Sequence, residues 1–196
     1  MISTLSKKHS FDTVFDSQKV FRLLLEAMSN PARVVNINEY AGKLYGDYPA
    51  LLAIAMTILD NEVSFNTCGN HVLSDEIASL TLSRKEYIES ADFIFVSDSG
   101  DIKTAIESAK CGSLSDPHKG ATIIILDDGV PSCRLKLSGP GIDGFAAITA
   151  TQTAMDAIIL RNAQNYEYPQ GIDLVVISSS GKLFALPRTT RMEVTA

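Results

Sequence analysis

Residues 137–142 have the composition of a backbone loop that can approach an anion closely. In this segment, Leu-Ser-Gly-Pro-Gly-Ile, two glycines flank a proline directly after an expected strand. Exposed N–H groups of such a loop can form an anion-binding nest. The segment lacks the Gly-Lys-Ser/Thr of a phosphate loop and the GxGxxG dinucleotide pattern. The pattern alone favours a sharp turn, and an anion site through Ser138, Gly139 and Gly141 is the alternative.

Residues 186–191, Leu-Pro-Arg-Thr-Thr-Arg, carry side chains suited to binding phosphate or carboxylate. Arg188 and Arg191 offer forked sets of N–H donors, and Thr189 and Thr190 add hydroxyl groups. The stretch from the last expected strand onward has three basic residues and one acidic residue, hence +2 in a chain of net charge -6. A solvated turn or a subunit contact is the competing interpretation. We predict a phosphate- or phosphonate-binding site that combines this segment with the Gly-Pro-Gly segment.

Other polar residues do not assemble into a catalytic set. Asp60 and Glu62 form an acidic pair of the kind that is common in solvated turns. The sequence has no GxSxG nucleophile elbow and no Ser–His–Asp arrangement that could be assigned. Lys119 and Lys136 could form a Schiff base with a pyridoxal cofactor, yet neither stands in a recognisable context. We therefore predict no catalytic residue and no cofactor, which leaves open whether the protein is an enzyme on its own.

The cysteines and histidines are scattered along the chain. A zinc site normally needs four ligands, usually in short-range pairs such as CxxC, and the sequence contains no such pair. We predict no metal site and interpret the cysteines as free thiols of a reducing compartment, which places the protein in the cytoplasm. The residues concerned are Cys68, Cys111, Cys133, His9, His71 and His118.

Length and composition fit one acidic, well-packed domain that spans residues 1–196. Hydrophobic residues make up 45% and charged residues 20%, and a chain of 196 residues can bury a substantial core. A pI near 5.0 argues against nucleic acid as the main partner. The polar start of the chain has no apolar signal core, and no apolar run reaches the ~18 residues needed to cross a bilayer. We expect neither nucleic acid nor a membrane among the partners.

Alternating helices and strands must position these residues. The apolar residues 121–126 are typical of a strand buried on both faces of a sheet. Residues 172–178 and 182–186, joined by a Ser-Ser-Gly turn, predict an antiparallel hairpin. The expected fold class is therefore α/β with a mixed sheet. The other expected strands are residues 33–38, 63–65, 91–96 and 134–138, and the expected helices are residues 16–29, 49–59, 73–82, 101–110 and 150–162.

Helical spacing predicts which faces of the helices are buried. The helix of residues 101–110 should end at Gly112, because glycine is common just past a helix C-terminus. The first helix should bury one face, formed by Val20, Phe21, Leu24, Leu25 and Met28. The last helix should present one face, formed by Ala154, Ala157, Ile158 and Arg161.

Many short blocks along the chain form a distinctive set in their order and spacing. They are residues 11–12, 14–18, 21–22, 27–29, Pro31, 59–60, 62–63, 91–94, 120–122, 137–142, 168–169, 171–174, Gly181 and 186–190. Together these blocks resemble one family, the H subunit of the carbon–phosphorus (C–P) lyase system, which bacteria use to extract phosphate from phosphonates. The resemblance covers about residues 11–191. One departure is Ala32, where the family usually has a glycine that permits a positive φ.

The resemblance implies a fold, partners and a reaction. The implied fold is a three-layer α/β/α sandwich related to pyridoxal-phosphate-dependent transferases, without the cofactor or its lysine. The implied assembly is a homodimer when alone and a core complex with the G, I and J subunits. In such systems the G, H, I and L proteins attach the phosphonate to the ribose C1 of ATP and displace adenine. Cleavage of the carbon–phosphorus bond belongs to the J subunit and its iron–sulfur cluster.

Three hypotheses for the function follow. The favoured one is an obligatory subunit of the phosphonate transfer complex, structural or substrate-positioning rather than catalytic, with ATP or a phosphonate as its ligand. The alternative is an independent transferase or hydrolase that binds a phosphorylated metabolite through residues 139–141, Arg188 and Arg191. A pure scaffold is the third. The absence of a coherent catalytic set in the sequence favours the first hypothesis over the second.

Overall fold

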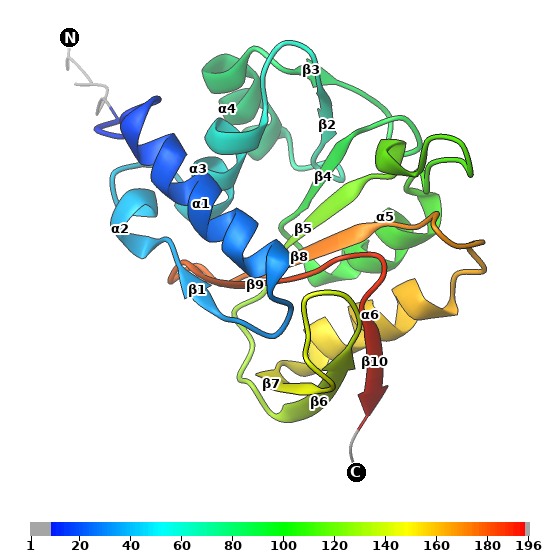
Figure 1. The fold of residues 1–196 in the computed structure, drawn as a ribbon. Coiled ribbons are helices and arrows are strands. Elements are labelled where there is room, and N and C mark those ends of the chain that lie inside the picture. Colours follow the sequence, from blue (N-terminus) through cyan, green and yellow to red (C-terminus); the bar gives the residue numbers. More distant parts are fainter. Residues whose placement is uncertain (1–8, 195–196) are drawn as a thin grey trace, which may run out of the picture.

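A seven-stranded mixed sheet forms the centre of the protein in the computed structural model, which describes residues 9–194 (Figure 1). Neighbouring strands from β3 to β8 run parallel, whereas β9 is antiparallel to β8 and β1 is antiparallel to β9. The predicted α/β class, the mixed sheet and the C-terminal hairpin are therefore confirmed. The strands, in order across the sheet, are β1 (Val35–Asn36), β9 (Lys182–Leu186), β8 (Asp173–Ile177), β5 (Thr122–Leu126), β4 (Phe93–Val96), β2 (Ser64–Asn66) and β3 (Arg84–Lys85).

Helices cover both faces of this sheet, and alternate residues of β5 pack into two different cores on these faces. Ile124 belongs to the core under the first helices, whereas Ile123 and Ile125 belong to a second core under α5 and α6. The predicted burial of this strand on both faces is thus confirmed. The helices on the first face are α1 (Phe15–Ser29), α2 (Asn38–Ala41), α3 (Pro49–Ile58) and α4 (His71–Thr81), and those on the second are α5 (Ile102–Ser108) and α6 (Gln152–Ala163). Two short 3-10 helices, Ser99–Asp101 and Pro117–Lys119, complete the described helical segments.

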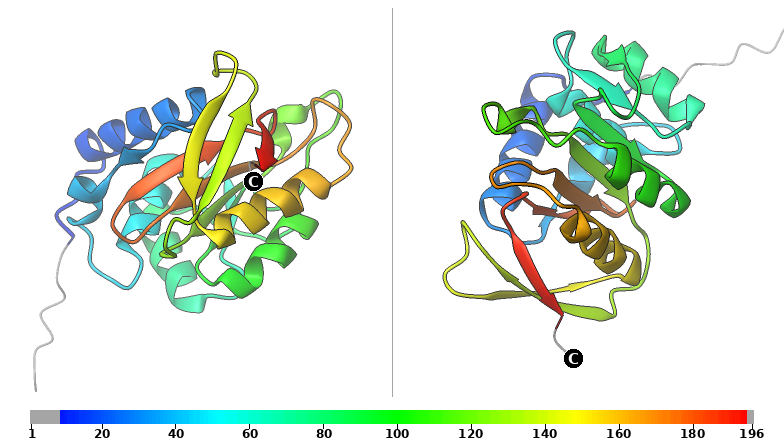
Figure 2. Two further views of the ribbon diagram at one scale, coloured as in Figure 1. Left: turned by 90° about the horizontal axis from the view of Figure 1, so that it is seen from below. Right: turned by 90° about the vertical axis from the view of Figure 1, so that its right-hand side faces the viewer.

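A second, three-stranded antiparallel sheet packs against the second core (Figure 2). It consists of β10 (Arg191–Val194), β6 (Cys133–Ser138) and β7 (Ala146–Ala150), in that order. The sequence correctly predicts β6, but β6 does not join the main sheet as a single mixed sheet would require. Its alternating pattern buries Leu135 and Leu137 on one face, and β7 and β10, which the sequence analysis missed, pair with its edges.

The helix predictions hold with two corrections. Phe21 and Leu25 of α1 are about half exposed, because the helix buries the stripe of Val20, Leu24 and Ala27 instead. The helix α5 ends at Ser108, so Gly112 does not cap it. Gly112 has a positive φ of 78° in a tight turn, where a Cβ would lie 2.8 Å from the Pro117 carbonyl oxygen. In the described part of the chain, every helix is too short or too polar to cross a bilayer.

The turn between α1 and β1 holds Ala32 in a left-handed conformation. The Arg33 N–H donates to the Asn30 carbonyl oxygen at 2.9 Å, Pro31 occupies the second position, and Ala32 has φ 80° at the third. This is the geometry of a type II turn, which favours glycine at the third position. The turn therefore keeps the backbone shape that a glycine would favour, at a cost of about 1–2 kcal/mol for the alanine Cβ.

We predict that Ala32→Gly raises the free energy of unfolding by about 0.5–1 kcal/mol, because relief of the left-handed strain exceeds the added flexibility of the unfolded chain. Urea unfolding followed by circular dichroism measures the change. Ala163→Gly at the exposed end of α6 is the control and should lower the free energy of unfolding. A loss of stability in Ala32→Gly would contradict the strain argument.

Candidate functional site

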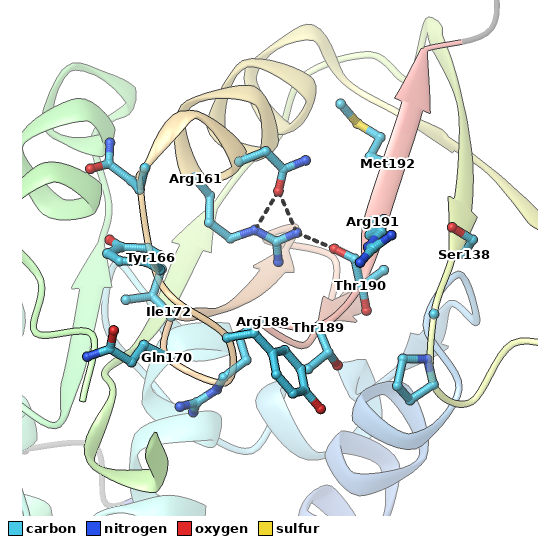
Figure 3. Close-up of a pocket in the computed structure, with 16 residues that line it drawn as sticks. Ser138, Arg161, Tyr166, Gln170, Ile172, Arg188, Thr189, Thr190, Arg191 and Met192 are labelled. Carbon is cyan, nitrogen blue, oxygen red and sulfur yellow. Dashed lines mark hydrogen bonds between the residues drawn. The ribbon is translucent and has the colours of Figure 1, made fainter. Parts of the chain in front are cut away.

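The two predicted anion-binding segments meet at one cleft of about 700 Å³ (Figure 3). They come together because β10 pairs with β6, which places Arg191 opposite Ser138. The lining contains three arginines and no acidic residue among the described residues. The predicted site residues that line the cleft are Ser138, Gly139, Arg188, Thr189, Thr190 and Arg191. Gly141 does not line it.

The Gly-Pro-Gly segment forms a turn, the interpretation that its pattern favoured. The Ile142 N–H donates to the Gly139 carbonyl oxygen at 3.1 Å, which closes the turn. Gly141 has φ 82°, and a Cβ there would lie 2.2 Å from the Ser29 carbonyl oxygen. The second glycine therefore lets the turn pack against the end of α1, while Gly139 remains at the edge of the cleft.

Arg188 makes most of its polar contacts within the protein. Its backbone N–H donates to Asp173 Oδ1 at 2.6 Å, Nε donates to the same oxygen at 3.2 Å, and Nη2 donates to Oδ2 at 2.5 Å. Nη1 also donates to the Pro117 carbonyl oxygen. Both side chains of the ion pair are more than four-fifths buried. A Cβ at Gly120 would lie 2.9 Å from Nη1, so the glycine leaves room for the guanidinium. These hydrogen bonds link Arg188, just after β9, to Asp173, the first residue of β8.

Arg161 of α6 is a buried cation at the cleft that sequence analysis placed on the helix face without a functional role. The predicted face of α6 is confirmed, and Arg161 is only 4% exposed. Its guanidinium donates to the carbonyl oxygens of Leu186, Pro187 and Thr190 at 2.9, 3.2 and 2.8 Å, and to Asn162 Oδ1. Burial lowers the pKa of Arg161 to about 10, and Asp173 opposes this shift. The group stays protonated at neutral pH, and an arginine on a buried helix face is the signal that could have identified it.

Thr190 and Arg191 provide the polar groups that the protein leaves available. Thr190 is 2% exposed, and its Oγ1 has no hydrogen-bond partner within the described residues. Arg191 is exposed at the start of β10 and forms no ion pair among residues 9–194. The cleft therefore combines buried positive charge, one exposed guanidinium and a hydroxyl group without a hydrogen-bond partner among the described residues, a composition suited to binding an anion.

The remaining candidate groups have local structural partners. Lys136 Nζ lies 3.1 Å from Glu193 Oε2, and Lys119 Nζ lies 3.4 Å from Asp116. The three cysteines are unpaired and half-buried, and burial together with Asp101 raises the pKa of Cys68 to about 11. Across residues 9–194 there is no group of three or more His, Cys, Asp or Glu side chains arranged to hold a metal ion.

We predict that Arg188→Ala lowers the free energy of unfolding by about 3–5 kcal/mol, because it leaves the buried Asp173 carboxylate without its partner. Arg191→Ala, which removes an exposed guanidinium, should change it by about 0.5 kcal/mol or less. Chemical unfolding of both variants measures the difference. Equal stabilities would show that the Arg188–Asp173 pair is not the structural contact described above.

Comparison with known proteins gives a consistent picture. Residues 9–193 match the family described as "Bacterial phosphonate metabolism protein (PhnH)". The chain is 28% identical over 178 residues to the "Putative C-P lyase subunit protein HtxG" of Stutzerimonas stutzeri, covering 90% of this chain and 86% of that protein. It is 25% identical over 194 residues to the "Alpha-D-ribose 1-methylphosphonate 5-triphosphate synthase subunit PhnH" of Rhizobium meliloti (strain 1021), covering 93% and 92%. The chain therefore belongs to the PhnH family of bacterial phosphonate metabolism proteins, as the resemblance in its sequence predicted.

Proposed function

We propose that this chain is a subunit of a C–P lyase complex and supports transfer of a phosphonate to the ribose C1 of ATP with loss of adenine. The observation that carries the proposal is the family match along residues 9–193. Both relatives are named as subunits, one of a C–P lyase and one of a ribose 1-methylphosphonate 5-triphosphate synthase. Each covers at least 90% of this chain, so the likeness is not confined to one motif.

The role proposed for the chain in that complex is structural or substrate-positioning. Lys119 and Lys136 form ion pairs with Asp116 and Glu193, and Asp60 accepts from the Glu62 N–H in a turn. The partners in this proposal are the G, I and J subunits, with the L subunit in the pathway, in the cytoplasm. A homodimer is the form proposed for the chain alone. The proposed fold is a three-layer sandwich like that of the pyridoxal-phosphate-dependent transferases, and the helices on both faces of the sheet support it.

We infer that the cleft is where a phosphate- or phosphonate-bearing ligand contacts this subunit. Its lining has three arginines and no carboxylate, in a chain whose net charge is -6. Such a local reversal of charge favours an anionic ligand, because guanidinium groups match phosphorus oxyanions in geometry and charge. The volume of about 700 Å³ is sufficient for a small molecule such as a nucleotide.

Turnover by the purified proteins tests the function. The chain alone, supplied with ATP and methylphosphonate, should release no adenine above the background without protein. Addition of the G, I and L proteins should start adenine release, and omission of this chain from that mixture should abolish it. Chromatography of free adenine measures the product. Robust release by the isolated chain would instead support an independent transferase, and full turnover without the chain would contradict a supporting role.

A further inference from the structure

Thr190 has a buried hydroxyl group whose hydrogen-bonding capacity the protein does not use. Buried polar groups in proteins are almost always hydrogen-bonded, since an unmade bond costs about 1–3 kcal/mol. Thr190 Oγ1 is buried without a partner among the described residues, and the residue lines the cleft. The hydroxyl is therefore an unused donor in a residue that lines the cleft, and a rotation of its side chain would present it to a ligand there.

Arg161 holds the backbone of the turn that carries this hydroxyl. Its Nη2 donates to the Thr190 carbonyl oxygen at 2.8 Å (Figure 3). Nη1 donates to the Leu186 carbonyl oxygen at 2.9 Å, so both ends of the turn are held. No carboxylate lies within ion-pair distance of the guanidinium in the described part of the chain. Its charge is therefore not cancelled by direct contact and favours an anion beside the turn.

The two arginines named in the predicted segment have different roles. Asp173 and Pro117 engage all three nitrogens of the Arg188 guanidinium. Arg191, by contrast, is exposed on the cleft lining and has no ion pair among residues 9–194. Arg191 is therefore the arginine that can turn its fork of donors toward a ligand.

We propose that Thr190 and Arg191 form an oxyanion subsite for a tetrahedral phosphorus oxyanion, with Arg161 as the positioning residue and Arg188 as a structural residue outside the ligand contacts. Two oxygens of a phosphonate or phosphate can accept from the Arg191 fork, and a third can accept from the Thr190 hydroxyl. A carboxylate has only two oxygens and cannot fill all three contacts. The inference rests on the proposed function in one respect, namely that a phosphate- or phosphonate-bearing ligand occupies the cleft.

Binding to the full-length chain tests the subsite, measured by isothermal titration calorimetry with methylphosphonate, inorganic tripolyphosphate and acetate. Thr190→Val should weaken binding of the phosphorus oxyanions about tenfold or more, and Thr190→Ser should retain it. Arg191→Gln should weaken binding by a similar factor, whereas Arg84→Gln, an exposed arginine on β3, should not. Tighter binding of tripolyphosphate than of methylphosphonate would identify the phosphate chain of a nucleotide as the source, and the reverse order would identify a free phosphonate.

Chemical unfolding of the same variants separates ligand contact from a structural role. Thr190→Val replaces an unpaired buried hydroxyl with a methyl group of similar shape, so the midpoint of unfolding should stay the same or rise. The subsite is wrong if Thr190→Val and Arg191→Gln both bind methylphosphonate and tripolyphosphate as tightly as the wild type. It is also wrong if the wild type binds neither at millimolar concentration. In both cases the proposed function is judged separately by adenine release from the assembled proteins.

Discussion

The cleft depends on how the protein accommodates the buried guanidinium groups of Arg161 and Arg188. A guanidinium removed from water is costly unless its donors find acceptors. Most of the acceptors lie in residues 186–190 and at the start of β8, and the others are Asn162 Oδ1 and the Pro117 carbonyl oxygen. The connection that follows β9 leads from the main sheet to β10 of the small sheet. The two arginines therefore fix both the turn and the direction in which the last strand leaves it.

The charges of the two arginines are balanced differently, and this difference gives the cleft its electrostatic character. Asp173 compensates Arg188 through two oxygens, whereas Arg161 relies on neutral carbonyl and amide oxygens. Burial lowers the pKa of Arg161 to about 10, which still leaves it charged at neutral pH. A positive charge without a contacting carboxylate attracts anions more strongly in a partly buried cleft than on an open surface. An acidic protein can thus hold a basic site of limited extent.

The sequence predicted what local patterns determine and missed what depends on distant pairing. Helical spacing identified the buried face of α6, and the apolar run of β5 predicted burial on both faces. The strand β10 was missed because it pairs with β6, which lies far away in the chain, and neither strand encodes that partner. The strand β7 pairs with β6 as its neighbour in the chain, but its alanine-rich sequence has weak strand propensity. The segment of Arg188 lies at the cleft, and the structural role of Arg188 was not foreseen. Asp173 is the first residue of β8 and Arg188 follows β9, so both lie at the open end of the predicted hairpin, and this placement was the available signal.

The position of the cleft relative to the main sheet also favours a positioning role. In open α/β sheets, ligands usually bind beyond the carboxyl ends of the parallel strands. Here Gly171 and Ile172, which line the cleft, immediately precede β8 and so lie at its amino end. The rest of the lining comes from α6 and the connection that follows it, from the connection between β9 and β10, from the start of β10, and from the end of β6 with the turn after it. The site therefore lies between the main sheet and the small sheet, at the end of the parallel strands opposite to the edge where such folds usually place their chemistry.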